Sequence, residues 1–252
     1  MKIHVITLFP GMFRGAFEES IIGRASGRGL VEVNIVDLRE FGVGRHKLTD
    51  DIVYGGGAGM LMKPEPIVSA VESITCQSDM ESTRPAWVVL TSARGRLFNQ
   101  RIAAELCSQS ELIVICGRYE GVDERVSQLV VDDEISVGDY VLTGGEIAAM
   151  AIVDATVRLI PGVVGSARSL DDESHSGELL EYPHYTRPAV YRDMEVPRVL
   201  LSGHHAEIAR WRREQSILTT ARRRPELLAG ANLDDSERAI AERARKSPGE
   251  DA

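Results

Sequence analysis

Two turns in the middle of the chain combine glycine with charged and aromatic residues, and each is associated with an apolar run. The run Leu112–Cys116 is followed by Gly117–Gly121, and the run Ile135–Leu142 contains Gly138–Tyr140 and is followed by Thr143–Glu146. Glycine lets a ligand approach the backbone closely. Because parallel strands bring such turns to one edge of a sheet, the spacing predicts a shared ligand site. Two ordinary strand–helix turns would give the same spacing.

The side chains near these turns suit a flat, polar ligand. Arginine donates hydrogen bonds to ring oxygens, and a carboxylate can accept a ring proton. Each charge has an alternative role as a surface charge or helix cap, and that role is expected for Asp123 and Glu124 because acids favour the first helical turn. The candidates for chemistry are Arg118, Glu120, Asp139, Glu146, Arg158 and the run Asp171-Asp172-Glu173.

Common catalytic signatures are absent from the sequence. It contains no GxGxxG, no GxxxxGK[ST] and no GxSxG, so a dinucleotide site, a P-loop and a serine hydrolase have no support. The histidines and cysteines form no zinc pattern, and no metal ligands are predicted. His204 and His205 are adjacent and cannot share a helix face, so we expect them at the surface.

The elements that would position the turns alternate between strands and helices, which predicts an α/β domain with a mainly parallel sheet. Strands are expected at Lys2–Leu8, Val31–Leu38, Trp87–Thr91, Leu112–Cys116 and Ile135–Leu142. Helices are expected at Gly11–Ile22, Pro66–Ile74, Asn99–Ser108, Asp123–Val131 and Glu146–Leu159.

Two long segments lack apolar periodicity. The first, residues 39–62, contains four glycines in five positions near Tyr54, and such a loop is usually functional or disordered. It could wrap around a planar or anionic ligand, or it could be a flexible linker. The second contains GSARSLDDESHSG and is predicted to be an interdomain linker. We therefore predict a domain at residues 1–164, a linker at 165–178 and a small helical domain at 179–252.

The last domain is predicted to be helical because apolar residues recur at helical spacing after residue 202. Ser202 is expected to be an N-cap. A break is expected near Gln215, followed by a second helix at Ser216–Arg224 that Pro225 ends. Asp234–Lys246 is predicted to be a polar terminal helix.

Charge is distributed unevenly along the 252 residues. The net charge is −9, yet Val196–Arg224 carries seven arginines against two acidic residues, and such a patch favours phosphate contacts. Three cysteines without CxxC spacing predict a reduced, cytoplasmic protein whose thiols pack in the core. No apolar run approaches the roughly 18 residues that a membrane span requires.

The sequence also resembles a known family along most of its length. The matching stretches include LFPGMF, DDIVYGGGAGMLMKP, CGRYEGVDERV, SVGDYVLTGGE, LIPGVVG, PHYTRP and VPRVLLSGHHAEIARWR, in that order from Ile3 to about Leu228. These stretches are similar to the bacterial tRNA (guanine-N1)-methyltransferases, which belong to the SPOUT class. The resemblance implies methylation of N1 of the guanine at tRNA position 37, next to the anticodon.

The resemblance further implies a deep trefoil knot that binds S-adenosylmethionine, and a homodimer in which the linker of one subunit reaches the cofactor of the other. Magnesium dependence is implied as well, and the tRNA anticodon stem-loop is the implied partner. The expected cofactor-binding residues are Thr91, Ser92, Ala93, Gly117, Arg118, Tyr119, Val137, Gly138, Asp139, Tyr140, Val141, Leu142, Gly144 and Gly145.

The family's general base is an aspartate in the linker, and this chain departs from that pattern. Alignment through Ser174-His175-Ser176 places Glu173 at the base position, and a small shift would place Asp172 there. Both residues remain candidates. Arg158 is expected to steady the guanine oxygen, and Glu120 is expected to make cofactor and metal-linked contacts. The alternatives are a related SPOUT enzyme that acts on ribosomal RNA and a non-catalytic RNA-binding relative.

Overall fold

The computed structural model describes residues 1–56, 59–76, 86–165, 174 and 178–246. Contacts within the chain divide it into two compact units, Met1–Gly165 and Ser166–Ala252, which are described separately. The three-part division into residues 1–164, 165–178 and 179–252 stays a prediction, because most of the expected linker lies outside the described residues.

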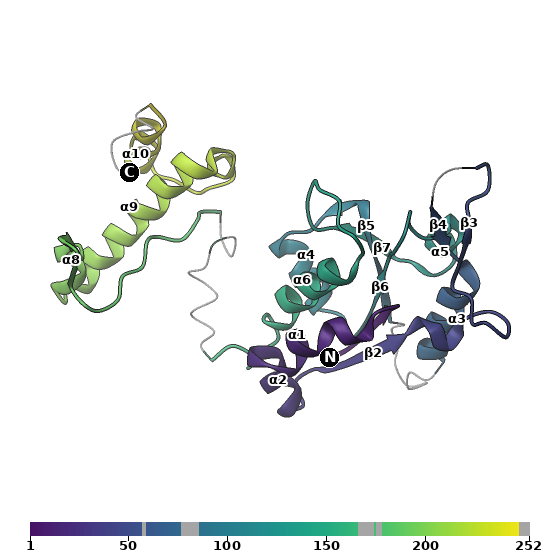
Figure 1. The fold of residues 1–252 in the computed structure, drawn as a ribbon. Helices are drawn as coiled ribbons and strands as arrows, with labels where there is room; N and C mark the ends of the chain where they lie inside the picture. Colours follow the sequence, from purple (N-terminus) through teal and green to yellow (C-terminus); the bar gives the residue numbers. More distant parts are fainter. Residues whose placement is uncertain (57–58, 77–85, 166–173, 175–177, 247–252) are drawn as a thin grey trace. The chain divides into compact units, whose positions relative to one another are not determined.

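The first unit is built on a five-stranded parallel sheet in the order β2-β1-β6-β5-β7 (Figure 1). Its central strand β6 is apolar over Leu112–Cys116 and has no exposed surface there, as expected for a parallel strand covered on both faces. The strands are β1 (Lys2–Thr7), β2 (Glu32–Asp37), β5 (Trp87–Leu97), β6 (Glu111–Cys116) and β7 (Asp133–Ser136). The predicted α/β class with a mainly parallel sheet is confirmed.

Helices cover both faces of this sheet and enclose two apolar cores (Figure 1). One face packs against α1 (Arg14–Glu18), α2 (Ser20–Gly27), α4 (Gln100–Cys107) and α6 (Glu146–Val157). The other packs against η2 (Leu38–Phe41), α3 (Pro64–Thr75) and α5 (Glu124–Val130). A 3₁₀ turn, η1 (Pro10–Phe13), leads into α1. Asp123 caps α5 by accepting a hydrogen bond from the amide of Arg125, as predicted.

The single helix predicted over Gly11–Ile22 is wrong, because the structure divides this stretch. The helix α1 ends at Glu18, and Ser20 has a φ of 55° before α2 continues the chain. The carbonyl of Glu18 lies against Gly23, where a Cβ atom would be only 2.3 Å from the oxygen. The stretch therefore forms two short helices with a turn at Glu19 and Ser20 between them.

Two predicted strand ends are also wrong, and both lie at the edge of the sheet that carries the glycine turns. The strand predicted at Ile135–Leu142 ends at Ser136, whose hydroxyl donates to the carbonyl of Gly138 and accepts from its amide. A side chain that bonds the backbone of the following turn competes with the strand ladder. By contrast, the strand predicted to end at Thr91 continues as β5 to Leu97, with a register shift between Thr91 and Arg96.

The glycine-rich segment of residues 39–62 is more ordered than predicted. A two-stranded antiparallel hairpin, β3 (Asp50–Ile52) and β4 (Met60–Met62), lies near its end. Its tip carries Tyr54, which is 97% exposed, and Gly57 and Ala58 lie outside the described residues. The segment is therefore not one long irregular loop.

The second unit has its own small core, formed by α9 (His205–Arg223) and α10 (Asp235–Lys246). The break predicted near Gln215 and the N-cap predicted at Ser202 are both wrong. The helix α9 is continuous because Ser216, Ile217, Thr220 and Ala221 form a buried face against this core. Shorter elements complete the unit: β8 (Val190–Tyr191), β9 (Met194–Glu195), α8 (Arg198–Leu201) and η3 (Pro225–Ala229).

The cysteines follow the sequence prediction only in part. Cys116 is buried in the core, whereas Cys76 is exposed because it comes directly after the last turn of α3. In the described part of the chain, no helix combines the length and apolar character that crossing a membrane would need.

Candidate active site

A cavity of about 360 Å³ lies where β6 and β7 end, beside the stretch of β5 in which the register shifts after Thr91. Parallel strands bring their carboxyl ends to one edge of a sheet, and ligands of open α/β sheets bind there. The lining residues of the described chain are Leu90, Thr91, Ser92, Ala93, Arg94, Gly117, Arg118, Tyr119, Glu120, Gly121, Val122, Ile135, Ser136, Val137, Gly138, Tyr140, Val141, Leu142, Thr143, Gly144, Gly145 and Ala148. The two turns therefore line one cavity, as their spacing predicts, while the binding of a ligand there stays a prediction.

Hydrogen bonds join Thr91 in β5 and the end of β6 to the start of α6. The hydroxyl of Thr91 donates to the carbonyl of Ile115 at 3.1 Å and accepts from the amide of Gly117 at 3.3 Å. The amide of Gly145 donates to the carbonyl of Gly117 at 2.8 Å. The two glycine turns named in the sequence are therefore in direct contact.

Close packing at this junction requires glycine at two positions. A Cβ atom on Gly145 would lie 2.8 Å from the amide nitrogen of Gly117 and 3.0 Å from the Cα atom of Cys116. A Cβ atom on Gly144 would lie 2.4 Å from Nε of Arg118. Real side chains do not come this close to backbone or to a fixed guanidinium, so the turn before α6 depends on the missing Cβ at both positions.

The loop after β7 forms another wall of the cavity and keeps aromatic and apolar side chains near solvent. The hydroxyl of Tyr140 donates to the carbonyl of Val137 at 3.3 Å, which closes the loop on itself. Tyr140 is 57% exposed and Val141 is 87% exposed. Such a loop leaves backbone groups and an aromatic ring available to a flat heterocycle.

Arg94 forms the wall on the β5 side and is held by two carboxylates. Its Nε and Nη2 atoms donate to both oxygens of Glu134 at 2.9 Å, and Nη2 also lies 2.6 Å from Glu124. The guanidinium lowers the pKa of Glu134 to about 2, with help from the hydroxyls of Ser127 and Ser92. The side chain of Arg94 is therefore fixed by charge-assisted bonds at the rim of the cavity.

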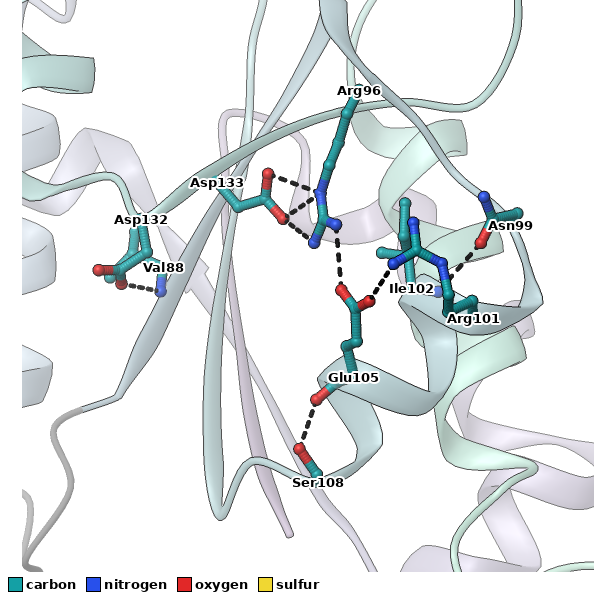
Figure 2. A network of polar contacts seen from close by, with 9 residues as sticks. All are labelled: Val88, Arg96, Asn99, Arg101, Ile102, Glu105, Ser108, Asp132 and Asp133. Atoms are coloured by element: carbon teal, nitrogen blue, oxygen red, sulfur yellow. Dashed lines mark hydrogen bonds and ion pairs between the residues drawn. The ribbon is translucent and has the colours of Figure 1, made fainter.

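A second arginine network holds β7, an edge strand of the sheet whose last residues line the cavity (Figure 2). Arg96, on the continuation of β5, bonds both oxygens of Asp133 in β7 and one oxygen of Glu105 in α4. Arg101 donates to the other oxygen of Glu105 at 3.0 Å. The bonds of Arg96 hold β7 and α4 against β5. They lie just after the stretch, between Thr91 and Arg96, in which the pairing register of β5 and β7 shifts.

A buried polar cluster lies behind the cavity. Glu146, the first residue of α6, is 1% exposed and accepts from the hydroxyl of Thr7 at 3.0 Å and from Nε of Arg118 at 3.1 Å. The Nη1 atom of Arg118 donates to the carbonyl of Thr143 at 2.8 Å. Burial and the negative charge of Glu146 raise the pKa of the neighbouring Cys116 thiol, which stays neutral.

Most of the residues predicted from sequence to bind a cofactor line this cavity. Thirteen of the fourteen do so. Asp139 is the exception, because it is exposed to solvent and does not line the cavity. Glu120 also lines the cavity, and its amide donates to the carbonyl of Met60 at 3.1 Å. The cavity brings these residues together, while their roles stay predictions.

The other predicted catalytic residues are not part of this lining. Arg158 is the C-cap residue of α6, about 18 Å along the helix from Glu146 at 1.5 Å per residue. Asp172 and Glu173 lie outside the described residues. Within the described residues no three histidine, cysteine, aspartate or glutamate side chains are placed to hold a metal ion.

Sequence reasoning missed several lining residues. Arg94 was not among the predicted residues, although a charged residue that closely follows the buried run Val88–Thr91 is a usable signal. Val122 and Ala148 carry no such signal, because only packing places them at the cavity. Leu90, Ile135 and Ser136 were missed as well, whereas Gly121 and Thr143 belong to the two turns from which the site was predicted.

Comparisons with known proteins agree with this geometry. The family model described as tRNA (Guanine-1)-methyltransferase TrmD matches residues 1–230. A Geobacter metallireducens protein named tRNA (guanine-N(1)-)-methyltransferase is 54% identical over 239 residues, which cover 94% of this chain and 95% of the relative. A protein of the same name from Geotalea uraniireducens is 53% identical and covers 100% of this chain and 100% of the relative. Another from Dehalococcoides mccartyi is 52% identical and covers 95% of this chain and 95% of the relative.

Proposed function

The chain belongs to the tRNA (guanine-1)-methyltransferase family, and on this premise we propose that it transfers a methyl group from S-adenosylmethionine to N1 of the guanine at position 37 of tRNA. The observation that carries the proposal is the meeting of the Gly117 and Gly145 turns at one cavity. No common hydrolase, P-loop or dinucleotide signature competes with this function.

The cavity suits S-adenosylmethionine in size and chemistry. Its volume of about 360 Å³ lies within the range of small-molecule sites. Glycine backbones at the ends of β6 and β7 would hold the adenosine, and the loop at Val137–Leu142 would cover it. When bound, the cofactor supplies an electrophilic methyl group on a sulfonium.

The residues of the chain would then act on the guanine. Asp172 or Glu173 would remove the proton from N1, and the lone pair of N1 would then form a bond to the methyl carbon as the carbon–sulfur bond breaks and S-adenosylhomocysteine leaves. Arg158 donates to the ring oxygen on which negative charge develops. Glu120 lines the cavity and would contact the cofactor. Magnesium dependence, which the family resemblance implies, stays a prediction.

We further propose that the enzyme is a homodimer with a deep trefoil knot, and that its site is shared between subunits. The position of Arg158 supports this arrangement, because it is at the opposite end of α6 from the cavity residues of its own chain. A second subunit would bring its Arg158 and linker to the cofactor. This proposal also explains why Arg158 does not line the cavity that Glu120 of the same chain lines.

The second unit is proposed to bind the anticodon stem-loop. Exposed arginines lie along α9 on both sides of its buried face. Arg212 stacks on Tyr182, with 4.8 Å between the guanidinium carbon and the ring centroid. Arginine and aromatic rings together suit phosphates and unstacked bases. A guanine beside the anticodon is in a single-stranded loop and can be turned into a pocket. We place the protein in the cytoplasm with its substrate.

The test is to locate a labelled methyl group after incubation with tRNA and labelled cofactor. We expect label on N1 of guanine 37, and label on ribosomal RNA alone would support the alternative SPOUT substrate. A protein that binds RNA but shows no calorimetric binding of S-adenosylmethionine would be a non-catalytic relative. Asp172→Ala and Glu173→Ala identify the base, since only the variant that loses the base should slow methyl transfer strongly.

A further inference from the structure

The buried carboxylate of Glu146 has no part in the proposed chemistry, yet it is the most deeply buried charge near the cavity. Its side chain is 1% exposed, and both of its oxygens accept hydrogen bonds, one from Thr7 and the other from Arg118. A buried charge is retained only when it is paired and hydrogen-bonded. The Thr7 hydroxyl is itself held in place, since it accepts from the amide of Phe9 at 2.9 Å.

Arg118 connects this carboxylate to the wall of the cavity. Its guanidinium donates to the carbonyl of Thr143 and lies 4.3 Å from the centroid of the Phe9 ring. Its own backbone belongs to the Gly117 turn, which also lines the cavity. One side chain therefore joins the loop after β6 to the loop before α6.

The ion pair also lies directly against the backbone of the second loop. A Cβ atom on Gly144 would be 2.4 Å from Nε of Arg118 and 2.6 Å from Oε2 of Glu146. The position of Gly144 is thus limited by the position of the pair. If the pair separates, the contact that supports this part of the cavity wall is lost.

We propose that Glu146 is a positioning residue for the cofactor. Its carboxylate, fixed by Thr7, holds the guanidinium of Arg118 so that the Gly117 turn and the Thr143–Gly145 loop keep the spacing that fits the adenosine. Arg118 thereby acts through the cavity wall, with its guanidinium turned toward Glu146. This inference rests on the proposed function, since it takes S-adenosylmethionine as the molecule in the cavity.

An acidic residue in the first turn of a helix also stabilises that helix through its dipole, and this general effect must be separated from positioning. The chain offers a matched control in α3, which has twelve residues like α6 and carries Glu65 in its first turn. Glu65 is exposed and lies 3.9 Å from Lys63, away from the cavity. Glu65→Gln removes a helix-terminal charge without touching the cavity wall.

The experiment compares Glu146→Gln with Glu65→Gln by calorimetric binding of S-adenosylmethionine and by steady-state kinetics with tRNA. Loss of a charge-assisted bond predicts about 10-fold weaker cofactor binding for Glu146→Gln and a similar rise of KM for the cofactor. The kcat and the KM for tRNA should stay within about 2-fold, because the reacting groups are unchanged. Glu65→Gln should bind the cofactor like the wild type.

Cofactor binding of Glu146→Gln equal to that of the wild type would overturn the inference, as would a loss in kcat with an unchanged KM for the cofactor. If Glu146→Gln does not fold, Thr7→Val decides instead: it keeps the shape of the side chain but removes the hydroxyl. About 3-fold weaker cofactor binding by this variant would support the inference, and unchanged binding would contradict it.

A double-mutant cycle tests the pathway through Arg118. If Glu146 acts through Arg118, then Arg118→Gln and the double variant should bind the cofactor equally weakly, and additive losses would show independent roles. Failure of the proposed function is distinguishable throughout, because in that case the wild-type protein itself would not bind S-adenosylmethionine.

Discussion

Gly145 and Thr91 are packed so tightly that a Cβ atom on the glycine would lie 2.0 Å from the threonine hydroxyl. The same hydroxyl bridges β5 and the end of β6, so it cannot move without breaking its bonds to Ile115 and Gly117. The start of α6 is therefore held against two strands, and the cavity has a fixed inner wall.

Gly145→Ala should therefore destabilise the protein and weaken cofactor binding together. Forcing one methyl group into a packed site costs about 1–3 kcal/mol. Chemical unfolding and calorimetry would measure the two effects. Gly27→Ala is the control, since Gly27 is helical with no atom near its Cβ position, and it should change the unfolding free energy by less than about 1 kcal/mol. Wild-type stability and affinity in Gly145→Ala would contradict the packing argument.

Arg96 and Arg101 bond the same carboxylate, that of Glu105, but should differ in their effect on stability. Arg96→Met leaves Asp133, whose side chain is 12% exposed, without its guanidinium, and we expect a loss of about 1–2 kcal/mol. Arg101 is 75% exposed, so Arg101→Met should cost less than about 0.5 kcal/mol. Urea unfolding measures the unfolding free energy of both variants. Equal losses would show that the bonds of Arg96 to Asp133 in β7 add no stability of their own.

The pair formed by Arg94 and Glu134 should make stability depend on pH in the acid range. The pKa of Glu134 is about 2 when folded and 4.5 ordinarily, so the pair stabilises the folded state fully above pH 4.5. As the pH falls from 4.5 toward 2, the unfolded chain binds a proton that the folded chain does not, and this stability is lost. Arg94 is 58% exposed, which limits the effect to about 1 kcal/mol.

Arg94→Gln should accordingly flatten the pH dependence of the unfolding free energy below pH 5. Glu134→Gln should flatten it in the same way, because it removes the group that titrates. A slope in either variant equal to that of the wild type would show that other carboxylates account for the acid sensitivity.

Reversal of charge at Arg222, Arg223 and Arg224 should weaken tRNA binding without changing cofactor affinity. All three are exposed at the end of α9. Each lost phosphate contact lowers the slope of log affinity against log salt by about 0.7 to 0.9, so filter binding at several salt concentrations is the measurement. Replacement of all three by lysine keeps the charge and should retain most of the affinity. Equal loss of cofactor binding would contradict a separate RNA-binding role.

The order of strands and helices could be predicted because β1, the first part of β5 and β6 are short apolar runs between turn residues, while β2 alternates apolar and polar residues. The glycine turns at 117 and 145 could be predicted because each follows an apolar run. The end of β7 could not be predicted, because the run stays apolar past Ser136 and only its side-chain bonds to Gly138 end the strand. Local pattern carries no information on such competition.

The roles of the charged residues were harder to predict than the fold. Glu146 was a candidate for chemistry by type alone, but its partner Thr7 is 139 residues away in the sequence. Arg118 was expected to face the cofactor, and the structure directs its guanidinium to Glu146. The continuous helix α9 was missed because its buried face is explained only by packing against α10.

The order of the sheet also constrains how the chain can reach its native state. The strand β1 lies between β2 and β6, and Lys2 pairs with Glu111. During synthesis β1 can therefore pair on one side early, while its other edge stays unpaired until more than one hundred further residues have been made. Such distant pairing slows folding and exposes an apolar edge to aggregation, so yield in cells should depend on protection of the nascent first strand.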